Sequence, residues 1–391
     1  MILYVMDSSA QSGRTTCTGK GKAILIEVKH LTKQYGDHIA VDDLSFTIEK
    51  GKIYGFLGPN GAGKSTTMNI ITGCLAATSG SITIDGHDIY KEPAAAKRCI
   101  GFLPELPPVY QDMTPKEYLQ FVGEVKGVSK ADMPAAVQKA MEQTGIVEMQ
   151  SRLIRHLSKG YRQRVGIAQA IIGDPEVIIL DEPTVGLDPL QIIEVRDLIR
   201  DLGKDHTVIL SSHILSEVAA VCDEILIISR GRLVANDTPD NLSKMLQESN
   251  VLHLSVMGTE AQIRYALAGV DGINALEFGE GESGSMDVHI TSDSSLDLRE
   301  SVFSACAASN LPLLSMQLEK ISLEDVFRQL TSDENPELVE RFAAAAEEAA
   351  EEAIKAADAA MEPTAVGPES ANPGEEVSSE ATGASGGEGE E

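Results

Sequence analysis

Unbroken apolar runs separated by helical patterns predict a parallel α/β core in the middle of this chain. Residues 177–180 read Val-Ile-Ile-Leu and are followed by two carboxylates. Strands of a parallel sheet are buried on both faces and have such continuous runs. The same reading predicts further strands at 207–211 and 224–229, and helices at 190–202 and 214–222. Alternation of strands and helices is the pattern of an α/β fold.

A small antiparallel sheet is expected before this core. Apolar residues recur at strand spacing over 23–28 and 44–48, on either side of the turn-rich Gln34-Tyr35-Gly36-Asp37. Further strands are predicted at 81–84 and 88–90, around the Asp85-Gly86 turn. A helix is predicted over 64–74.

Residues 105–160 change character and predict an all-α insertion. Thr114-Pro115-Lys116-Glu117 has the pattern of a capping box with proline at the first helical position, and it opens a helix to about Val125. A second helix is expected from Ser129 to Thr144, ending at Gly145. The prolines in residues 101–108 predict an extended connector between the insertion and the core.

The C-terminal third predicts a second, smaller α+β domain over 250–331, in the order βαββαβ of a ferredoxin-like fold. Its function is open between dimer stabilisation, regulation and plain packing, and packing is favoured because no catalytic pattern occurs there. The expected strands are 252–256, 273–278, 286–290 and 313–318, with helices at 259–268, 295–308 and 322–330.

Charge changes the picture mainly at the C-terminus. The 391 residues carry a formal net charge of −28, but residues 333–391 contain 17 acidic and 2 basic residues. We interpret this segment as an acidic, Ala/Glu-rich low-complexity tail, with a solvated helix over 333–362 and disorder beyond Pro363. The mildly acidic remainder does not favour a nucleic-acid partner. Residues 1–22 are expected to be a flexible lead before a domain over 23–245.

Membrane-spanning and disulfide-rich classes are both disfavoured. No stretch approaches the roughly 18 consecutive apolar residues of a membrane-spanning helix. The five cysteines are scattered and form no C-x-x-C pair, so neither a disulfide framework nor a zinc site is expected, and a reducing cytosol is the simplest location.

The most specific pattern is a phosphate-binding loop. Residues 56–67 match G-x-x-x-x-G-K-[ST] at every fixed position, between an apolar run that ends at Leu57 and a helix-forming segment that begins at Lys64. Glycines let successive backbone N–H groups face one concavity, and the helix N-terminus adds partial positive charge. Lys64 is expected to bridge the β- and γ-phosphates, and the Ser65 hydroxyl to bind Mg²⁺.

Together with other landmarks in order, this loop makes residues 25–245 resemble the nucleotide-binding domain of an ATP-binding cassette (ABC) protein. The wording of the motifs is most similar to cassettes of ABC-2-type exporters, including multidrug and gliding-motility-type systems. The landmarks are Tyr35, the loop from Gly58 to Thr66, the Pro-rich connector, Leu157-Ser158-x-Gly160, Asp181-Glu182, the Asp188 loop and His213.

The resemblance implies ATP and Mg²⁺ and assigns a role to each landmark. The implied catalytic residues are Glu182 as the base that deprotonates water, His213 as a γ-phosphate contact, Lys64 and Glu105. The implied metal ligands are Ser65, Asp181 and Glu105. The implied nucleotide contacts are Tyr35, Gly58, Pro59, Asn60, Gly61, Ala62, Gly63, Lys64, Ser65, Thr66, Ser158, Gly160 and Asp188.

Some of these assignments stay open. Tyr35 is either a stacking face for adenine or an ordinary turn tyrosine. Glu105 stands where the family has a glutamine, and a carboxylate lacks the amide's donor, which puts its catalytic role in doubt. Lys159 and Tyr161 replace the commoner signature residues, as they do in the exporter subfamily.

The predicted function is that of an ATPase subunit of an ABC transporter at the cytoplasmic face of the membrane. By resemblance, Ser158 and Gly160 face the nucleotide of a second cassette, so ATP would close a head-to-tail dimer, in the first instance a homodimer. A separate membrane-spanning permease subunit is the expected partner, docked near Leu106 to Tyr110. Two alternatives remain: a non-transport ABC protein acting on a ribosome or nucleic acid, and a nucleotide-dependent regulator.

Overall fold

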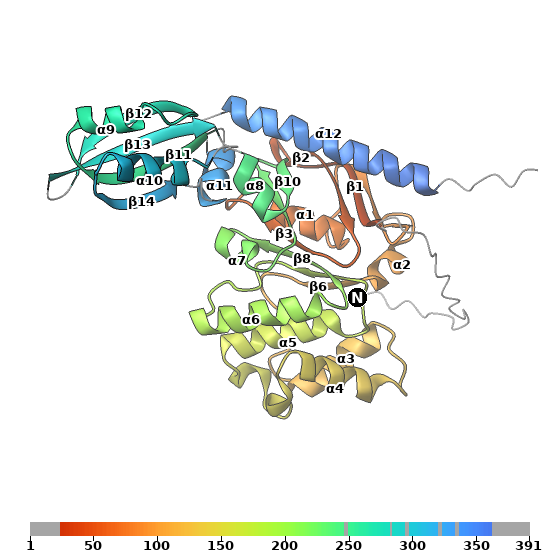
Figure 1. Ribbon diagram of the computed structural model, residues 1–391. Coiled ribbons are helices and arrows are strands. Elements are labelled where there is room, and N and C mark those ends of the chain that lie inside the picture. Colours follow the sequence, from red (N-terminus) through yellow and green to blue (C-terminus); the bar gives the residue numbers. More distant parts are fainter. Residues whose placement is uncertain are drawn as a thin grey trace, which may run out of the picture.

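The computed structural model describes residues 24–245, 249–281, 284–293, 297–319, 323–332 and 336–361. Three sheets organise these residues, two in the body of the molecule and one in a C-terminal unit (Figure 1). The predicted lead over residues 1–22 and the tail beyond Met361 lie outside the described residues. Within them, no helix is long and apolar enough to span a membrane.

The six-stranded sheet is the predicted α/β core, and its strand order is β10-β9-β3-β8-β7-β6. All neighbours pair in parallel except β9 and β10, which pair antiparallel. Leu57 at the end of β3 pairs with Ser212 at the end of β8, so the carboxyl ends of the central strands meet at one edge. The strands are β3 (Ile53–Leu57), β6 (Ile100–Leu103), β7 (Val177–Leu180), β8 (Thr207–Ser212), β9 (Glu224–Ser229) and β10 (Arg232–Asp237).

The sequence pattern did not predict two strands of this sheet, β6 and β10. The residues 101–108 were expected to be an extended connector, but their first part belongs to edge strand β6. The antiparallel strand β10 and the helix that follows it were not predicted either. Both are short segments, where periodicity carries little information.

The second sheet is antiparallel, as predicted, and has the order β2-β1-β4-β5. The strand predicted at 88–90 is present as β5 but ends at Asp88, because the Asp88 carboxylate accepts the N–H groups of Tyr90 and Lys91 and turns the chain towards an unpredicted helix. The elements are β1 (Ile24–Tyr35), β2 (His38–Glu49), β4 (Ser79–Ile84), β5 (His87–Asp88) and the helix α2 (Pro93–Arg98).

Helices flank the core sheet, and the insertion is helical as expected (Figure 1). The Thr114 capping box is formed, with both of its hydrogen bonds to Glu117. The second insertion helix starts at Met133 rather than Ser129, because Ser129 and Asp132 close a turn before it. The helices are α1 (Lys64–Ile71), α3 (Pro115–Val125), α4 (Met133–Gln143), α5 (Lys159–Ile171), α6 (Pro189–Leu202), α7 (Leu215–Ala219) and α8 (Pro239–Met245), with 3-10 turns at Val147–Met149 and Ile154–His156.

The C-terminal unit has the predicted element order βαββαβ around its own apolar core. Its four strands pair antiparallel in the order β12-β13-β11-β14. The closing helix α11 (Leu323–Thr331) packs instead against α7, α8 and β9 of the body of the molecule. The elements are β11 (Ser249–Met257), α9 (Glu260–Leu267), β12 (Ile273–Glu280), β13 (Ser285–Asp293), α10 (Arg299–Ala308) and β14 (Leu313–Glu319).

The last described helix differs from its prediction. α12 (Pro336–Met361) was expected to be solvated all round, but one of its faces is buried against β2 and β10 (Figure 1). Alanines, which bury little surface each, formed that face, so composition alone did not reveal it. Ala343, Ala346, Ala350 and Ile354 follow helical spacing and are all buried.

Candidate nucleotide site

The phosphate-binding loop lies between β3 and α1, at the edge where the carboxyl ends of the core strands meet. Gly61 and Gly63 have φ of 81° and 104°, a region that favours glycine. A Cβ on Gly63 would stand 2.5 Å from the Ala40 carbonyl oxygen, so no side chain fits there. The loop therefore has the backbone shape and the helix N-terminus that an anion needs.

Lys64 is almost fully buried within this loop, with 6% of its surface exposed. Its Nζ donates to the carbonyl oxygens of Gly58 at 2.8 Å and Pro59 at 3.2 Å, and lies 3.7 Å from the Glu182 carboxylate. Burial lowers the pKa of Lys64, while the carboxylates of Glu182, Asp181 and Glu105 act in the opposite direction. Burying the Lys64 cation is costly, and the cation faces the phosphate-binding loop, so Lys64 is suited to bind a phosphate group.

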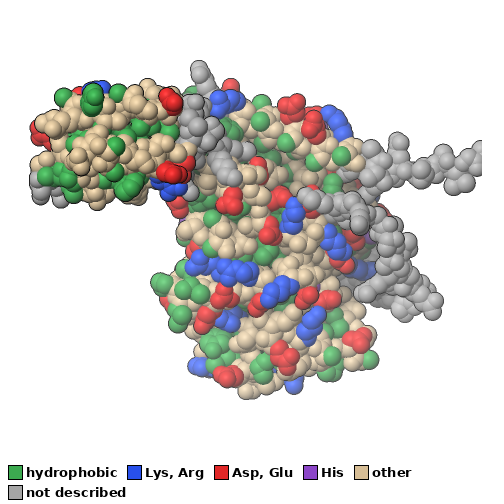
Figure 2. Space-filling model, viewed as in Figure 1, with side chains coloured by type: hydrophobic (Ala, Val, Ile, Leu, Met, Phe, Trp, Pro, Cys, Tyr) green, Lys and Arg blue, Asp and Glu red, His purple; other side chains and the backbone are tan. Residues whose placement is uncertain are grey.

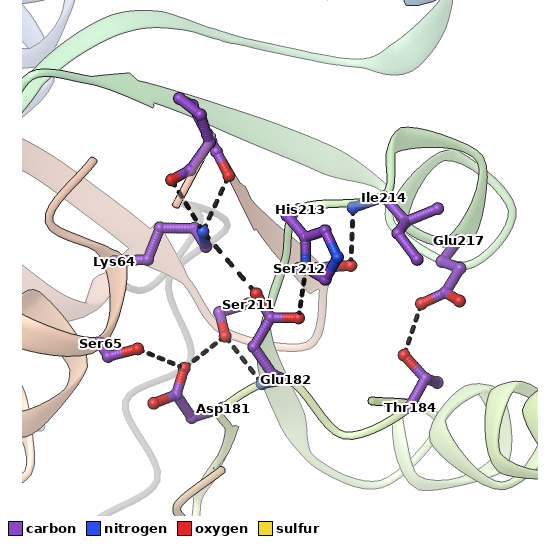
Figure 3. A network of polar contacts seen from close by, with 12 residues as sticks. Lys64, Ser65, Asp181, Glu182, Thr184, Ser211, Ser212, His213, Ile214 and Glu217 are labelled. Carbon is purple, nitrogen blue, oxygen red and sulfur yellow. Dashed lines mark hydrogen bonds and ion pairs between the residues drawn. The ribbon is translucent and has the colours of Figure 1, made fainter. Parts of the chain in front are cut away.

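Asp181 follows strand β7 and is the most deeply buried carboxylate of the site, with 3% exposed. Its Oδ1 accepts hydrogen bonds from the hydroxyls of Ser65, at 3.2 Å, and Ser211, at 2.5 Å (Figure 3). Ser211 near the end of β8 was not predicted as a site residue. A hydroxyl near the carboxyl end of a strand that neighbours β7 was the available signal.

Glu182 is held from three sides (Figure 3). Its N–H donates to Ser211 Oγ at 2.8 Å, its Oε2 lies 3.0 Å from His213 Nδ1, and its Oε1 faces Lys64. Its φ of 48° is in the left-handed region, which costs a non-glycine residue about 1–3 kcal/mol and occurs most often at functional sites. The backbone, Lys64 and His213 together fix the direction of this carboxylate.

A cavity of about 470 Å³ opens over these residues. Ten of the predicted site residues line it: Tyr35, Asn60, Gly61, Gly63, Lys64, Ser65, Thr66, Glu105, Glu182 and His213. Sequence reasoning missed three further lining residues, His38, Ala40 and Val185. The half-exposed Tyr35 ring stands at the cavity, with Lys33 Nζ 5.0 Å from its centroid.

Gly58, Pro59, Ala62 and Asp181 support the cavity without lining it. A Cβ on Gly58 would lie 2.4 Å from the Ile228 carbonyl oxygen, so this glycine is needed for packing between strands. The carbonyls of Gly58 and Pro59 hold Lys64. In this structure these two carbonyls contact the loop's own lysine, and the nucleotide contacts of Gly58 and Pro59 stay a prediction.

Ser158, Gly160 and Asp188 do not reach the cavity of their own chain. Ser158 caps α5 by accepting from Tyr161 N–H at 3.3 Å, and Asp188 caps α6 by accepting from Gln191 N–H at 2.9 Å. The two caps belong to neighbouring helix ends, because a Cβ on Gly160 would stand 2.7 Å from the Gln191 amide.

Arg164 ties these two helices together. It donates to Glu194 of α6 at 2.6 Å and to the Thr144 carbonyl after α4 at 3.0 Å. The helix ends that carry Ser158 and Asp188 are therefore parts of one rigid face.

The residues present fit a Mg²⁺ ion next to a bound phosphate. Mg²⁺ prefers hard oxygen ligands and usually takes only one or two from protein, with the rest from phosphate and water. Ser65 and Asp181 supply a hydroxyl and a carboxylate side by side. In the described part of the chain, no group of three or more His, Cys, Asp and Glu residues forms a complete cage for a metal.

Loop, buried lysine, and a strand-end Asp-Glu pair define a P-loop nucleoside triphosphatase. The ABC transporter family model matches residues 41–185. The linearmycin resistance ATP-binding protein LnrL of Bacillus subtilis (strain 168) is 32% identical over 308 residues, which cover 78% of this chain and 98% of that protein. The bacitracin transport ATP-binding protein BcrA of Bacillus licheniformis is 40% identical over 222 residues, 56% of this chain and 72% of that protein.

A solved structure described as the ATP binding subunit of an ABC transporter has the same fold. It is 32% identical, with a TM-score of 0.52 over 56% of this chain and 92% of that structure. The chain belongs to the ABC transporter family, and it is an ATP-binding, ATP-hydrolysing subunit of such a transporter. The predicted family and the predicted P-loop fold of the ATP-binding part are confirmed.

Proposed function

We propose that this protein binds MgATP in the cavity over Lys64, closes head to tail with a second copy, and drives export through a separate permease at the cytoplasmic face of the membrane. The observation that carries the proposal is the linked set Lys64, Glu182 and His213 at one wall of that cavity. It combines a phosphate-binding cation, a candidate base and a γ-phosphate contact.

Nucleotide binding would change the partners of Lys64. Its Nζ now bonds to two carbonyl oxygens of its own loop. The β- and γ-phosphates would replace these with stronger charge-assisted bonds, while backbone N–H groups of the loop hold the phosphate oxygens. Ser65 and Asp181 would hold Mg²⁺, which when bound neutralises charge on the transferring phosphoryl group. Tyr35 would provide a stacking face for adenine.

Glu182 is the proposed base for hydrolysis. Its carboxylate would take a proton from a water whose oxygen attacks the γ-phosphorus, as the bond between that phosphorus and the β–γ bridging oxygen breaks and ADP leaves. His213 contacts Glu182 through Nδ1, and its side chain lines the cavity where the γ-phosphate would lie. Glu105 also lines the cavity and adds negative charge near Lys64, and we propose no step of the reaction for it.

The second half of the site would come from the second copy. Ser158 caps α5 on the surface, outside its own cavity, and the N-terminus of that helix is a suitable anion site. A partner cassette facing Lys64 with this helix would contact the γ-phosphate. ATP then acts as the ligand that selects the closed dimer, and phosphate release reopens it.

The permease is proposed to dock on an exposed apolar surface beside the connector, formed by Leu106, Tyr110, Phe121 and Val125. Leu106 and Val125 are 83% and 72% exposed. The Tyr110 ring packs edge-on against Phe121, with centroids 5.5 Å apart, so the surface is ordered. An amphipathic cytoplasmic helix of the permease is the partner that fits such a surface.

The names of two relatives support a substrate class. LnrL is named for linearmycin resistance and BcrA for bacitracin transport. We extend this to the present chain and propose that its transporter exports an antibiotic or a related peptide-like compound.

The nucleic-acid alternative has less support. The net charge is −28, and Figure 2 shows acidic and basic side chains interspersed over the visible face of the ATP-binding body. A nucleic-acid surface would need a concentrated basic patch.

Affinity purification from detergent-solubilised membranes tests the proposal. The wild-type chain should recover a polytopic membrane protein, and a Leu106→Ser/Tyr110→Ser variant should lose it while still hydrolysing ATP. Tyr265→Ser, at an exposed aromatic residue of the C-terminal unit, is the control and should retain the partner. Recovery of ribosomes or DNA in place of a membrane protein would overturn the transport assignment.

A further inference from the structure

Helix α12 is attached to the body at the edges of two sheets. β2 is the edge strand of the antiparallel sheet and β10 is the edge strand of the core sheet. α12 packs on both (Figure 1). Its Ala343 joins the apolar core on one side of the core sheet, and its Ala346 joins the core that also contains Ala62 and Met68 of the nucleotide loop and α1. The helix therefore covers two open sheet edges and touches both cores.

One ion pair fastens α12 to the start of β10. Arg232 Nη2 lies 2.9 Å from Glu347 Oε1, and both side chains are partly buried. This hydrogen bond is the main reason that the pKa of Arg232 is raised. A guanidinium held in one geometry by a carboxylate fixes the backbone from which it projects.

That backbone is directly bonded to the nucleotide loop. Gly231, the residue before Arg232, donates its N–H to the Ala62 carbonyl at 3.0 Å and accepts from Asp42 N–H at 2.9 Å. A Cβ on Gly231 would stand 2.9 Å from the Ala40 carbonyl oxygen, the same atom that closely approaches Gly63. The turn between β9 and β10, the start of β2 and the phosphate-binding loop therefore pack tightly against one another. Ala40 and Gly63 also line the cavity.

We propose that α12 is a strap that holds the nucleotide loop in its binding conformation, with Arg232 as the positioning residue and Glu347 as its anchor. The proposal rests on the assignment of the cavity over Lys64 to ATP. It gives a role in nucleotide affinity to a segment that composition presents as part of a low-complexity tail.

Few contacts separate α12 from the cavity: the Glu347–Arg232 ion pair and then backbone hydrogen bonds of Gly231. Movement of Glu347 would release Arg232, then the Gly231 hairpin, and then the Ala62 carbonyl. The catalytic carboxylate Glu182 has its own supports, Ser211 and His213, and neither takes part in these contacts. Loss of the strap should therefore weaken nucleotide binding more than it slows turnover at saturation.

The test compares nucleotide affinity and turnover in the full chain. Glu347→Gln and Arg232→Met should each raise the Kd for a fluorescent ATP analogue about five-fold, which corresponds to roughly 1 kcal/mol. The kcat at saturating ATP should change less than two-fold. The exchanged pair Arg232→Glu/Glu347→Arg should recover most of the affinity.

Lys355→Met is the matched control. It removes an ion pair to Glu351 that lies on the same helix and does not involve the body of the protein. Its Kd should equal that of the wild type. The proposal that α12 is a strap would be overturned if all these variants bound the ATP analogue as tightly as the wild type. It would also be overturned if the exchanged pair did not reverse the increase in Kd. Failure of the wild-type chain to bind ATP would instead overturn the assignment of the cavity.

Discussion

His213 Nδ1 and Glu182 Oε2 lie 3.0 Å apart, across the carboxyl ends of two neighbouring strands of the core sheet. The other oxygen of the same carboxylate faces Lys64. The residue that is to activate water is thus linked both to the phosphate-binding lysine and to the histidine that would contact the γ-phosphate. In the proposed mechanism, hydrolysis and nucleotide sensing would share one carboxylate.

Glu182→Gln should separate ATP binding from hydrolysis. The amide keeps the size of the side chain but cannot take a proton, so steady-state hydrolysis should fall by about 10²-fold or more. The Kd for ATP should change little. A phosphate-release assay and equilibrium binding measure the two quantities, and near-normal hydrolysis would refute the base assignment.

Ser211→Ala should disturb both carboxylates at once. The hydroxyl donates to Asp181 and accepts from the Glu182 N–H, and its loss leaves buried polar groups without a partner, at about 1–3 kcal/mol. We expect hydrolysis to fall by roughly ten-fold or more, since 1.4 kcal/mol corresponds to a factor of ten. Ser212→Ala is the control, because that hydroxyl accepts only from Ile214 N–H among the hydrogen bonds described. Equal activity of the two variants would remove Ser211 from the site.

Breaking the Arg164–Glu194 pair should affect the dimer and spare the half-site over Lys64. Arg164→Met frees α5 from α6, so Ser158 and Asp188 no longer present one rigid face, and small misplacements at an active site can cost up to about 10²-fold. Turnover should fall about ten-fold while the Kd for ATP of the monomer stays unchanged. An Arg164→Glu/Glu194→Arg exchange should restore part of the lost turnover. Unchanged turnover in Arg164→Met would show that the pair is not needed for the composite site.

Lys126 should make stability depend on pH. Its Nζ donates to the carbonyls of Gln169, Ala170 and Ile172 at the end of α5, and burial lowers its pKa to about 8. Between pH 8 and the ordinary lysine pKa of 10.5, the unfolded chain binds more protons than the folded one, so stability rises with pH. Below pH 8 the cost of burying the ammonium is fully present.

The comparison is with Lys126→Met, which has no titrating group at this position. Thermal unfolding between pH 7 and pH 10 should show the wild type gaining stability relative to the variant. Parallel curves would mean that Lys126 is not buried as an ammonium.

The part of the site that lies over Lys64, and much of the fold, could be predicted from the sequence for physical reasons. Residues 56–67 have a motif in which every fixed position has a function, and the run Val177–Leu180 ends at the two carboxylates. Long helices with caps, such as α3, could be located from Thr114 and Glu117. Information of this kind is local, and pattern reading recovers it.

The sequence pattern could not show which residues distant segments bring together. Ser211 is a site residue only because β8 lies beside β7, and His38 and Ala40 only because β2 returns along the loop. The buried face of α12 is formed mainly by alanines, whose pattern differs little from that of a solvated Ala/Glu helix. In each case the decisive fact is which element lies alongside, and this depends on pairings between distant segments.

A mixing experiment tests the central claim, a composite ATP site shared by two copies, most directly. Lys64→Ala removes the phosphate lysine of a chain, and Ser158→Arg blocks the helix end that would face the partner's nucleotide. Each variant alone should be inactive. In a mixture, a mixed dimer has one site with both defects and one site with none, so we predict that ATP hydrolysis reappears on mixing and rises with the proportion of mixed dimers. A mixture as inactive as its two components, or a Ser158→Arg protein with wild-type turnover, would contradict the account.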